Sequence, residues 1–212
     1  MIANILNHPE FDTNTKKAMY ESFLKTQEDL KAMTDRFYWN NSAGSTAGTV
    51  LIRGKTLYAA WAGDSMASMY IANDKHVELI DPHKPGSQTE KARIERLGGF
   101  VSDEMGVARV NGAVAVSRAF GNIRHRVIIP EPDVKELHLK GHEEFIVLAC
   151  DGLWDVMTPS EVGKFVRRYM GENGRRTQGV SMALVDEALR RGSTDNVSVI
   201  FVEFKDWKGP KR

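Results

Sequence analysis

The sequence predicts an α+β fold in which antiparallel β-sheets are covered by helices. Strand-like segments follow one another in long runs, without the alternating helices that a doubly wound parallel sheet requires. Turn-forming sequences separate these segments at hairpin spacing, and Asn111-Gly112 is the clearest of them. The 212 residues are enough for one large domain with a sizeable core, so we expect a single domain over residues 1–212.

The charge balance excludes several classes of partner. The 29 basic and 28 acidic residues nearly cancel, so the chain lacks the basic field that marks proteins binding nucleic acid or anionic membranes. Its apolar runs are far shorter than a membrane span, and its first residues lack the pattern of a signal peptide. We therefore expect a cytoplasmic or nuclear protein with no nucleic-acid or membrane partner, and the sequence favours no particular oligomeric state.

The first half of the chain is predicted to be a helix followed by strands. Apolar residues at helical spacing predict an amphipathic helix over residues 14–33. Residues 46–80 contain four short apolar or alternating runs, which predict an antiparallel meander. Turn-like sequences separate these runs at residues 53–55, 62–65 and 73–75. Ser87 and Glu90 have the spacing of a capping box and begin a short helix that we expect to end at Gly98.

The second half begins with more strands. The Asn111-Gly112 pair lies between apolar runs and predicts a hairpin over residues 107–116. The alternating residues 134–139 and the apolar residues 145–150 predict two further strands.

Two helices and a last strand complete the chain. Thr158 and Glu161 predict a second capping box, at the start of a helix that Gly171 ends. Another helix, stopped at Gly192, is indicated by apolar residues on one face, namely Val180, Leu184 and Ala188. The last strand is predicted over residues 196–204.

Two aspartates stand at the predicted ends of core strands. The strand 145–150 stops at Asp151, because an ionised carboxylate is costly to bury unless it is paired or bound to a metal, and Gly152 permits a tight bend there. Asp195 comes just before the last strand. If both strand ends share one rim of a sheet, these oxygen ligands suit hard divalent ions such as Mg²⁺ or Mn²⁺. No His/Cys cluster has the spacing of a zinc site.

Each polar residue near these strand ends also has a purely structural explanation. Asp151 fits a turn, Asp155 fits the cap of the next helix, and Asp195 fits the opening of a strand. Cys150 lies in an apolar run, which favours a buried small hydrophobic residue over a nucleophile. Serine-nucleophile motifs are absent, and the six histidines have no partner at fixed spacing, so we expect them at the surface or at caps.

Six segments in fixed order go beyond these patterns: SAGSTAGTVLI, AAWAGDSMASMY, PHKPGSQTEKARIERLGGFV, RVNGAVAVSRAFGN, LACDGLWDVMTPSEV and RGSTDNVSVIFV. In order and approximate spacing they resemble the metal-dependent protein serine/threonine phosphatases of the 2C type. The resemblance covers residues 14–204 and is closest to the calmodulin-kinase phosphatase branch of that family.

The resemblance implies a fold, a cofactor and a reaction. The fold is two packed antiparallel β-sheets flanked by helices, an αββα sandwich. The matching positions make Asp151 and Asp195 metal ligands, while Asp155 matches a residue associated with a weaker metal. The cofactor is Mn²⁺ or Mg²⁺. The reaction is hydrolysis of phosphoserine or phosphothreonine in a phosphoprotein substrate by a metal-activated water, with no catalytic residue beyond the metal ligands.

One family motif is missing from the 212 residues. The opening D-G-H-G-G motif does not occur; in the family it precedes the first helix and carries the aspartate that bridges two metal ions. We therefore expect a domain that is incomplete at its N-terminus, lacks the first strands, and has impaired activity. Two alternatives remain open: a non-catalytic pseudophosphatase that binds or regulates phosphoproteins, and an unrelated fold whose aspartates only form turns.

Overall fold

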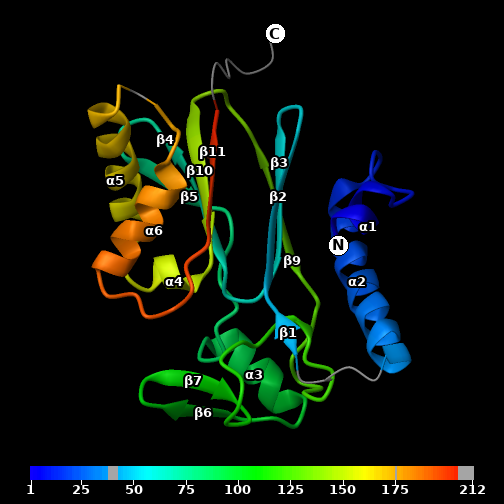
Figure 1. Ribbon diagram of the computed structural model, residues 1–212. Coiled ribbons are helices and arrows are strands. Elements are labelled where there is room, and N and C mark those ends of the chain that lie inside the picture. Colours follow the sequence, from blue (N-terminus) through cyan, green and yellow to red (C-terminus); the bar gives the residue numbers. More distant parts are fainter. Residues whose placement is uncertain (38–42, 175, 205–212) are drawn as a thin grey trace. The chain divides into compact units, whose positions relative to one another are not determined.

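The computed structural model describes residues 1–37, 43–174 and 176–204 (Figure 1). It consists of helices and several antiparallel sheets, as the sequence predicts. Within these residues, no helix has the length and apolar character needed to cross a membrane. Two compact units alternate along the chain: a first unit of Met1–Leu51, Tyr58–Asp64 and Pro82–Glu136, and a second unit of Ile52–Leu57, Ser65–Asp81 and Leu137–Arg212. The prediction of a single domain stays a prediction.

The first unit contains two N-terminal helices and most of a three-stranded sheet. The helices are α1 (Ile2–Leu6), which was not predicted, and α2 (Thr15–Phe37), which extends beyond the predicted range. The sheet has the order β2-β3-β9 and is formed by β2 (Ala47–Arg53), β3 (Thr56–Ala62) and β9 (Asp133–His138). Met19 and Phe23 of α2 pack with Ala60 and Ala62 of β3 in one buried cluster. The apolar face predicted for α2 is therefore its core-facing side.

The first unit also contains a short two-stranded pairing that holds residues 120–121 in place. Strand β1 (Gly44–Ser45) pairs antiparallel with β8 (Phe120–Gly121). The Phe23 and Phe120 rings lie 5.2 Å apart between centroids, and the Gln27 side chain exchanges two hydrogen bonds with the backbone of Gly121. Helix α2 is thereby attached to β8.

Helix α3 (Gln88–Arg96) begins where predicted, but its capping differs. The Ser87 hydroxyl accepts a hydrogen bond from the Glu90 backbone N–H at 3.4 Å. The Glu90 carboxylate does not complete the box; it accepts hydrogen bonds from Arg93 and Arg118 instead. The predicted capping box is therefore only half formed, because two arginines bind the carboxylate.

The hairpin next to α3 is formed one turn earlier than predicted. Strands β6 (Val101–Glu104) and β7 (Val107–Val110) pair antiparallel around Met105 and Gly106, which both have positive φ. Asn111 and Gly112 also have positive φ and form a turn, yet only an isolated bridge, Val110 to Val114, follows it. The Asn-Gly pair therefore forms the predicted turn, but residues 113–116 do not form the predicted second strand of a hairpin.

One histidine contradicts the expectation that all six lie at the surface or at caps. His83 is only 5% exposed, and its ring stacks on Trp61 at 5.8 Å. Its Nδ1 accepts a hydrogen bond from the Gly63 N–H at 3.2 Å, and its carbonyl accepts one from the Ser117 hydroxyl at 2.8 Å. His83 is thus a buried structural residue of the first unit.

The second unit contains a four-stranded antiparallel sheet of order β11-β10-β4-β5. Its strands are β4 (Met66–Ile71), β5 (Lys75–Glu78), β10 (Glu143–Ala149) and β11 (Val199–Glu203). The predicted meander over residues 46–80 is wrong in one respect, since β3 and β4 belong to different sheets. The last strand also begins later than predicted, at Val199.

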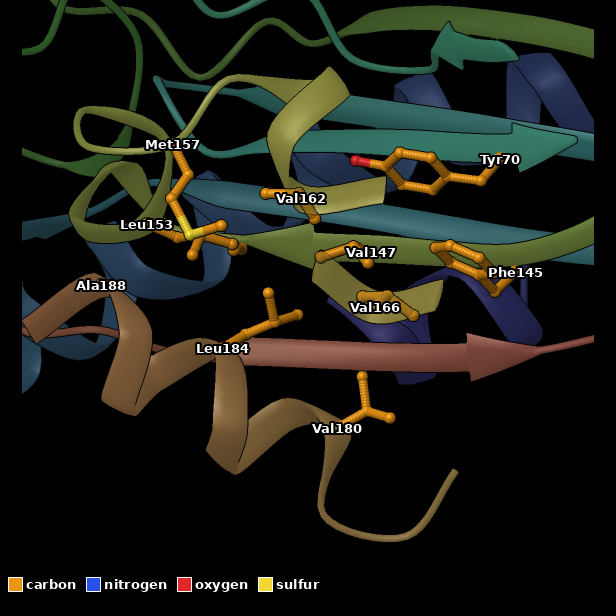
Figure 2. Close-up of a cluster of buried hydrophobic side chains, with 11 residues drawn as sticks. Tyr70, Phe145, Val147, Leu153, Met157, Val162, Val166, Val180, Leu184 and Ala188 are labelled. Atoms are coloured by element: carbon orange, nitrogen blue, oxygen red, sulfur yellow. The ribbon is translucent and has the colours of Figure 1, made fainter. Parts of the chain in front are cut away.

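Three helices belong to this unit: α4 (Asp151–Trp154), α5 (Pro159–Glu172) and α6 (Val180–Arg190). The last residue of α5 is Glu172 and its C-cap is Asn173, so Gly171 does not end it. Apolar side chains of β4, β10 and all three helices form one buried cluster (Figure 2). Tyr70 and Phe145 stack at 4.6 Å within it, and the predicted face of α6 points into the same cluster. This core holds the strand ends that carry the candidate site.

Candidate metal centre

The end of β10 and the start of β11 meet at one rim of the sheet, which is the condition that the sequence set for a shared site. The two strands pair antiparallel, and Ala149, the last residue of β10, lies opposite Val199, the first residue of β11. Asp151 follows Ala149 by two residues, and Asp195 precedes Val199 by four. Both aspartates therefore belong to segments that leave the same edge of the same sheet.

The segment after β10 turns directly into the short helix α4. Asp151 is its first residue and is half-buried, while Gly152 and Leu153 are buried. The Trp154 indole N–H is placed to donate to two backbone carbonyls, those of Met66 at 3.1 Å and Ala149 at 3.2 Å. These contacts attach α4 to the beginning of β4 and the end of β10.

The segment before β11 lies against this helix. The Ser193 hydroxyl donates to the Gly152 carbonyl at 2.7 Å. The Cys150 thiol donates to the Asn196 carbonyl at 3.2 Å and accepts from the Ser198 N–H at 3.2 Å. Ser193, before Asp195, thus contacts Gly152, which follows Asp151. Asn196, after Asp195, contacts Cys150, which precedes Asp151.

Gly152 has a different role from the one predicted. It lies in α4 and is not among the residues with positive φ, so it does not form a left-handed bend. A β-carbon at Gly152 would lie 2.5 Å from the Asn196 carbonyl oxygen, far inside van der Waals contact. The absence of a side chain is therefore required by the close approach of the Asp195 segment.

The carboxylates offer oxygen ligands in a partly exposed setting. One oxygen of Asp151 accepts a hydrogen bond from the Gly152 N–H at 3.0 Å, and one oxygen of Asp195 accepts from the Asn196 N–H at 2.6 Å. Among residues 1–37, 43–174 and 176–204, no three acidic, histidine or cysteine side chains gather closely enough to hold a metal ion. Mg²⁺ keeps several of its waters and commonly binds through one or two carboxylates, so the side chains of Asp151 and Asp195 are of the ligand type that such an ion prefers.

Asp155 is exposed and is the C-cap residue of α4, where its N–H donates to the Asp151 carbonyl at 2.9 Å. The cap of α5 is the predicted box: the Thr158 hydroxyl accepts from the Glu161 N–H, and the Glu161 carboxylate accepts from the Thr158 N–H. The cap role considered for Asp155 is therefore filled by Thr158 and Glu161.

A salt bridge connects α6 to the start of α5. Arg191 donates to the Glu161 carboxylate at 2.7 Å, to the Glu187 carboxylate at 2.8 Å and to the Val156 carbonyl at 3.3 Å. Hydrogen bonds from Arg191 and then from Thr158 lower the pKa of the Glu161 carboxyl to about 2. Glu161 is thus ionised at neutral pH and keeps both the cap and the salt bridge.

Three residues of this region were misjudged or missed from the sequence. Cys150 is half-buried and hydrogen-bonded, so it is not a fully buried hydrophobic residue. Ser193 and Arg191 were not singled out at all. The Ser193 partner Gly152 lies 41 residues earlier in the chain, and the Arg191 partners Val156 and Glu161 lie 35 and 30 residues earlier. No spacing rule connects residues so far apart, although the Arg191 contact with Glu187 has ordinary helical spacing.

The chain matches a known family of enzymes. A family model described as protein phosphatase 2C matches residues 2–197. The chain therefore belongs to the protein phosphatase 2C family, and an unrelated fold with turn aspartates is excluded.

Known proteins agree with this assignment. Probable protein phosphatase 2C 7 from Oryza sativa is 40% identical over 206 residues, which are 96% of this chain and 52% of the relative. Human protein phosphatase 1F is 38% identical over 206 residues, 96% of this chain and 44% of the relative. The chain thus spans about half the length of these relatives.

Solved structures confirm the fold. A C. elegans sex determining protein superimposes with a TM-score of 0.84 and 25% identity, over 94% of this chain and 49% of the other. The serine-threonine phosphatase 2C from Toxoplasma gondii gives a TM-score of 0.78 and 23% identity, over 96% of this chain and 74% of the other. The predicted α+β class is therefore the fold of this family.

Proposed function

We propose that the protein hydrolyses phosphoserine and phosphothreonine in phosphoprotein substrates, with Mn²⁺ or Mg²⁺ as its cofactor. The observation that carries the proposal is the meeting of the Asp151 and Asp195 segments at one sheet rim, in a chain of the protein phosphatase 2C family.

In this proposal Asp151 and Asp195 hold the principal metal ion, and Asp155 contributes to a weaker one. A divalent cation, when bound, lowers the pKa of a water molecule and offsets the negative charge of the phosphate. The protein's own residues supply the oxygen ligands and keep them at fixed spacing. No protein nucleophile is required for this chemistry.

The missing D-G-H-G-G motif limits what these 212 residues do alone. Two divalent cations a few ångströms apart repel each other strongly, and a bridging carboxylate is one of the groups that hold such a pair together. We propose that the 212 residues by themselves bind at most one metal ion weakly and turn over phosphopeptides near background.

The test is a phosphate-release assay with a phosphothreonine peptide and Mn²⁺. It compares the 212-residue chain with the same chain preceded by a family segment that carries D-G-H-G-G. We expect Mn²⁺-dependent turnover only with the added segment, and its loss in Asp195→Asn. Asp186→Asn, an exposed aspartate of α6, is the matched control and keeps activity. Inactivity of the extended chain, or full activity of Asp195→Asn, contradicts the proposal.

A non-catalytic role of these 212 residues is the second candidate, since the D-G-H-G-G motif does not occur within them. In that case the chain binds phosphoproteins, or regulates an intact relative, without hydrolysis. Isothermal titration calorimetry with a phosphothreonine peptide separates the two. A binding module takes up the peptide equally well with EDTA and with Mn²⁺, whereas an enzyme of the proposed type binds it more tightly when Mn²⁺ is present.

A further inference from the structure

We propose that Ser193 and Cys150 are positioning residues that hold Asp195 at a fixed place relative to Asp151. The inference rests on the metal site of the proposed function and gives a role to two residues that lie beside its expected ligands. Asp195 lies in a loop between α6 and β11 and is exposed. Its position therefore depends on what fixes the loop on either side.

Ser193 fixes the loop before Asp195. Its N–H donates to the Ala188 carbonyl at 3.0 Å, and its hydroxyl donates to the Gly152 carbonyl at 2.7 Å. Ala188 belongs to α6 and is fully buried in the core of the second unit. Through Ser193, the end of α6 is attached to the helix that Asp151 begins.

Cys150 fixes the loop after Asp195. Its thiol donates to the Asn196 carbonyl and accepts from the Ser198 N–H, both at 3.2 Å. Its own N–H donates to the Ser198 carbonyl at 3.3 Å. Cys150 is the residue directly before Asp151, so these contacts join the two ligand-bearing segments beside the ligands themselves.

The two attachments leave Asp195 little freedom. Only Thr194 separates Asp195 from Ser193, and Asn196 is its direct neighbour. Gly152 allows the segments to approach, since any side chain there would meet the Asn196 carbonyl. A metal site tolerates ligand displacements of about half an ångström, so loosening either attachment is expected to weaken metal binding without removing a ligand.

The test measures Mn²⁺ binding to the 212-residue chain by electron paramagnetic resonance of free Mn²⁺, which suits weak sites and does not depend on turnover. We expect Ser193→Ala and Cys150→Ala each to raise the Kd for Mn²⁺ by about 10- to 100-fold, the usual effect of removing a residue that supports a metal ligand. Ser193→Thr retains the hydroxyl, and Cys150→Ser replaces the thiol by a hydroxyl that can also donate and accept. Both are expected to keep most of the affinity.

Ser198→Ala is the matched control, because Ser198 contacts Cys150 through its backbone; its Kd should equal that of the wild type. Thermal melts show which variants are folded, and each attachment is judged on folded variants. The inference is overturned if folded Ser193→Ala or Cys150→Ala binds Mn²⁺ like the wild type while Asp195→Asn does not. If Asp151→Asn and Asp195→Asn both bind like the wild type, the proposed metal site itself is wrong.

Discussion

Gly152 and Asn196 approach so closely that a single added carbon would separate them. A β-carbon on Gly152 would lie 2.5 Å from the Asn196 carbonyl oxygen and 3.2 Å from its carbonyl carbon. Backbone atoms cannot rotate away as the end of a flexible side chain can. The contact therefore sets how near the Asp151 and Asp195 segments lie.

Gly152→Ala should destabilise the protein even though alanine favours helices. Alanine in a helix is worth up to about 1 kcal/mol relative to glycine, but forcing an extra carbon into a packed site costs roughly 1 to 3 kcal/mol. We expect a net loss in the free energy of unfolding, measured by urea denaturation, together with weaker Mn²⁺ binding.

The matched control is Gly171→Ala in α5, where a β-carbon would meet nothing within 4 Å. At Gly171 only the difference in helix propensity applies, so we expect the free energy of unfolding to rise by about 0.5 to 1 kcal/mol. Equal stability changes for the two variants would show that the contact with Asn196 is unimportant.

Glu90→Gln should cost more than any other single change suggested for the first unit. Glu90 is 2% exposed and forms ion pairs with Arg93 at 2.8 Å and Arg118 at 2.7 Å. Removing one partner of a buried ion pair typically costs about 3 to 5 kcal/mol, because the remaining charges stay buried. The control is Glu95→Gln on the same helix, an exposed residue 4.0 Å from Lys91, for which under about 1 kcal/mol is expected.

The same carboxylate makes stability depend on pH. Burial by itself would raise the pKa of Glu90, but hydrogen bonds from Arg118, Arg93 and Ser117 outweigh it and lower the pKa from 4.5 to about 2. Its contribution is therefore complete above pH 4.5 and is lost as the pH falls towards about 2. The stability difference between wild type and Glu90→Gln, measured in urea at each pH, should shrink over this interval. A constant difference would contradict the ion-pair explanation.

Thr158→Ala should destabilise α5. The Thr158 hydroxyl accepts from the Glu161 N–H at 3.3 Å and donates to the Glu161 carboxylate at 2.8 Å. Losing such an N-cap usually costs about 1 kcal/mol. Thr158→Ser keeps the hydroxyl and should lie close to wild type in the same thermal or urea unfolding experiment. A serine variant as unstable as the alanine variant would assign the loss to packing instead.

Asp155→Asn should affect metal binding less than Asp151→Asn. Asp155 is exposed at the end of α4, whereas Asp151 is half-buried beside the Asp195 segment. In the Mn²⁺ binding experiment we expect a large loss for Asp151→Asn, beyond the roughly 100-fold that supporting residues reach. For Asp155→Asn we expect a change under about tenfold. Equal losses would make Asp155 a principal ligand.

The elements that local rules describe were largely predictable. Helical spacing located α2 and α6, and the Thr158 and Glu161 box begins α5 as expected. The end of β10 shortly before Asp151 was also predictable, because a buried strand cannot carry an ionised carboxylate without a partner. In each case the determining contacts lie within a few residues of one another.

Two of the failures have a competing partner that lies far away in the chain. Glu90 leaves its capping box because Arg118, 28 residues later, binds its carboxylate together with the nearby Arg93. The meander is divided because β4 pairs with β10 rather than with β3. Long-range partners of this kind override local propensity.

By itself, the sequence determined the four longer helices α2, α3, α5 and α6, most of the strands and the two aspartates near strand ends, since residue type and short spacing decide where an element begins and stops. Only the tertiary structure decided that the Asp195 loop is attached to α4, through a Ser193 hydroxyl and a Cys150 thiol. The structure also decided why residue 152 is a glycine: the Asn196 backbone lies where a side chain would be, and no left-handed bend is formed there. These contacts join segments more than 40 residues apart, and their strength depends on a packed core that brings both segments to the same rim.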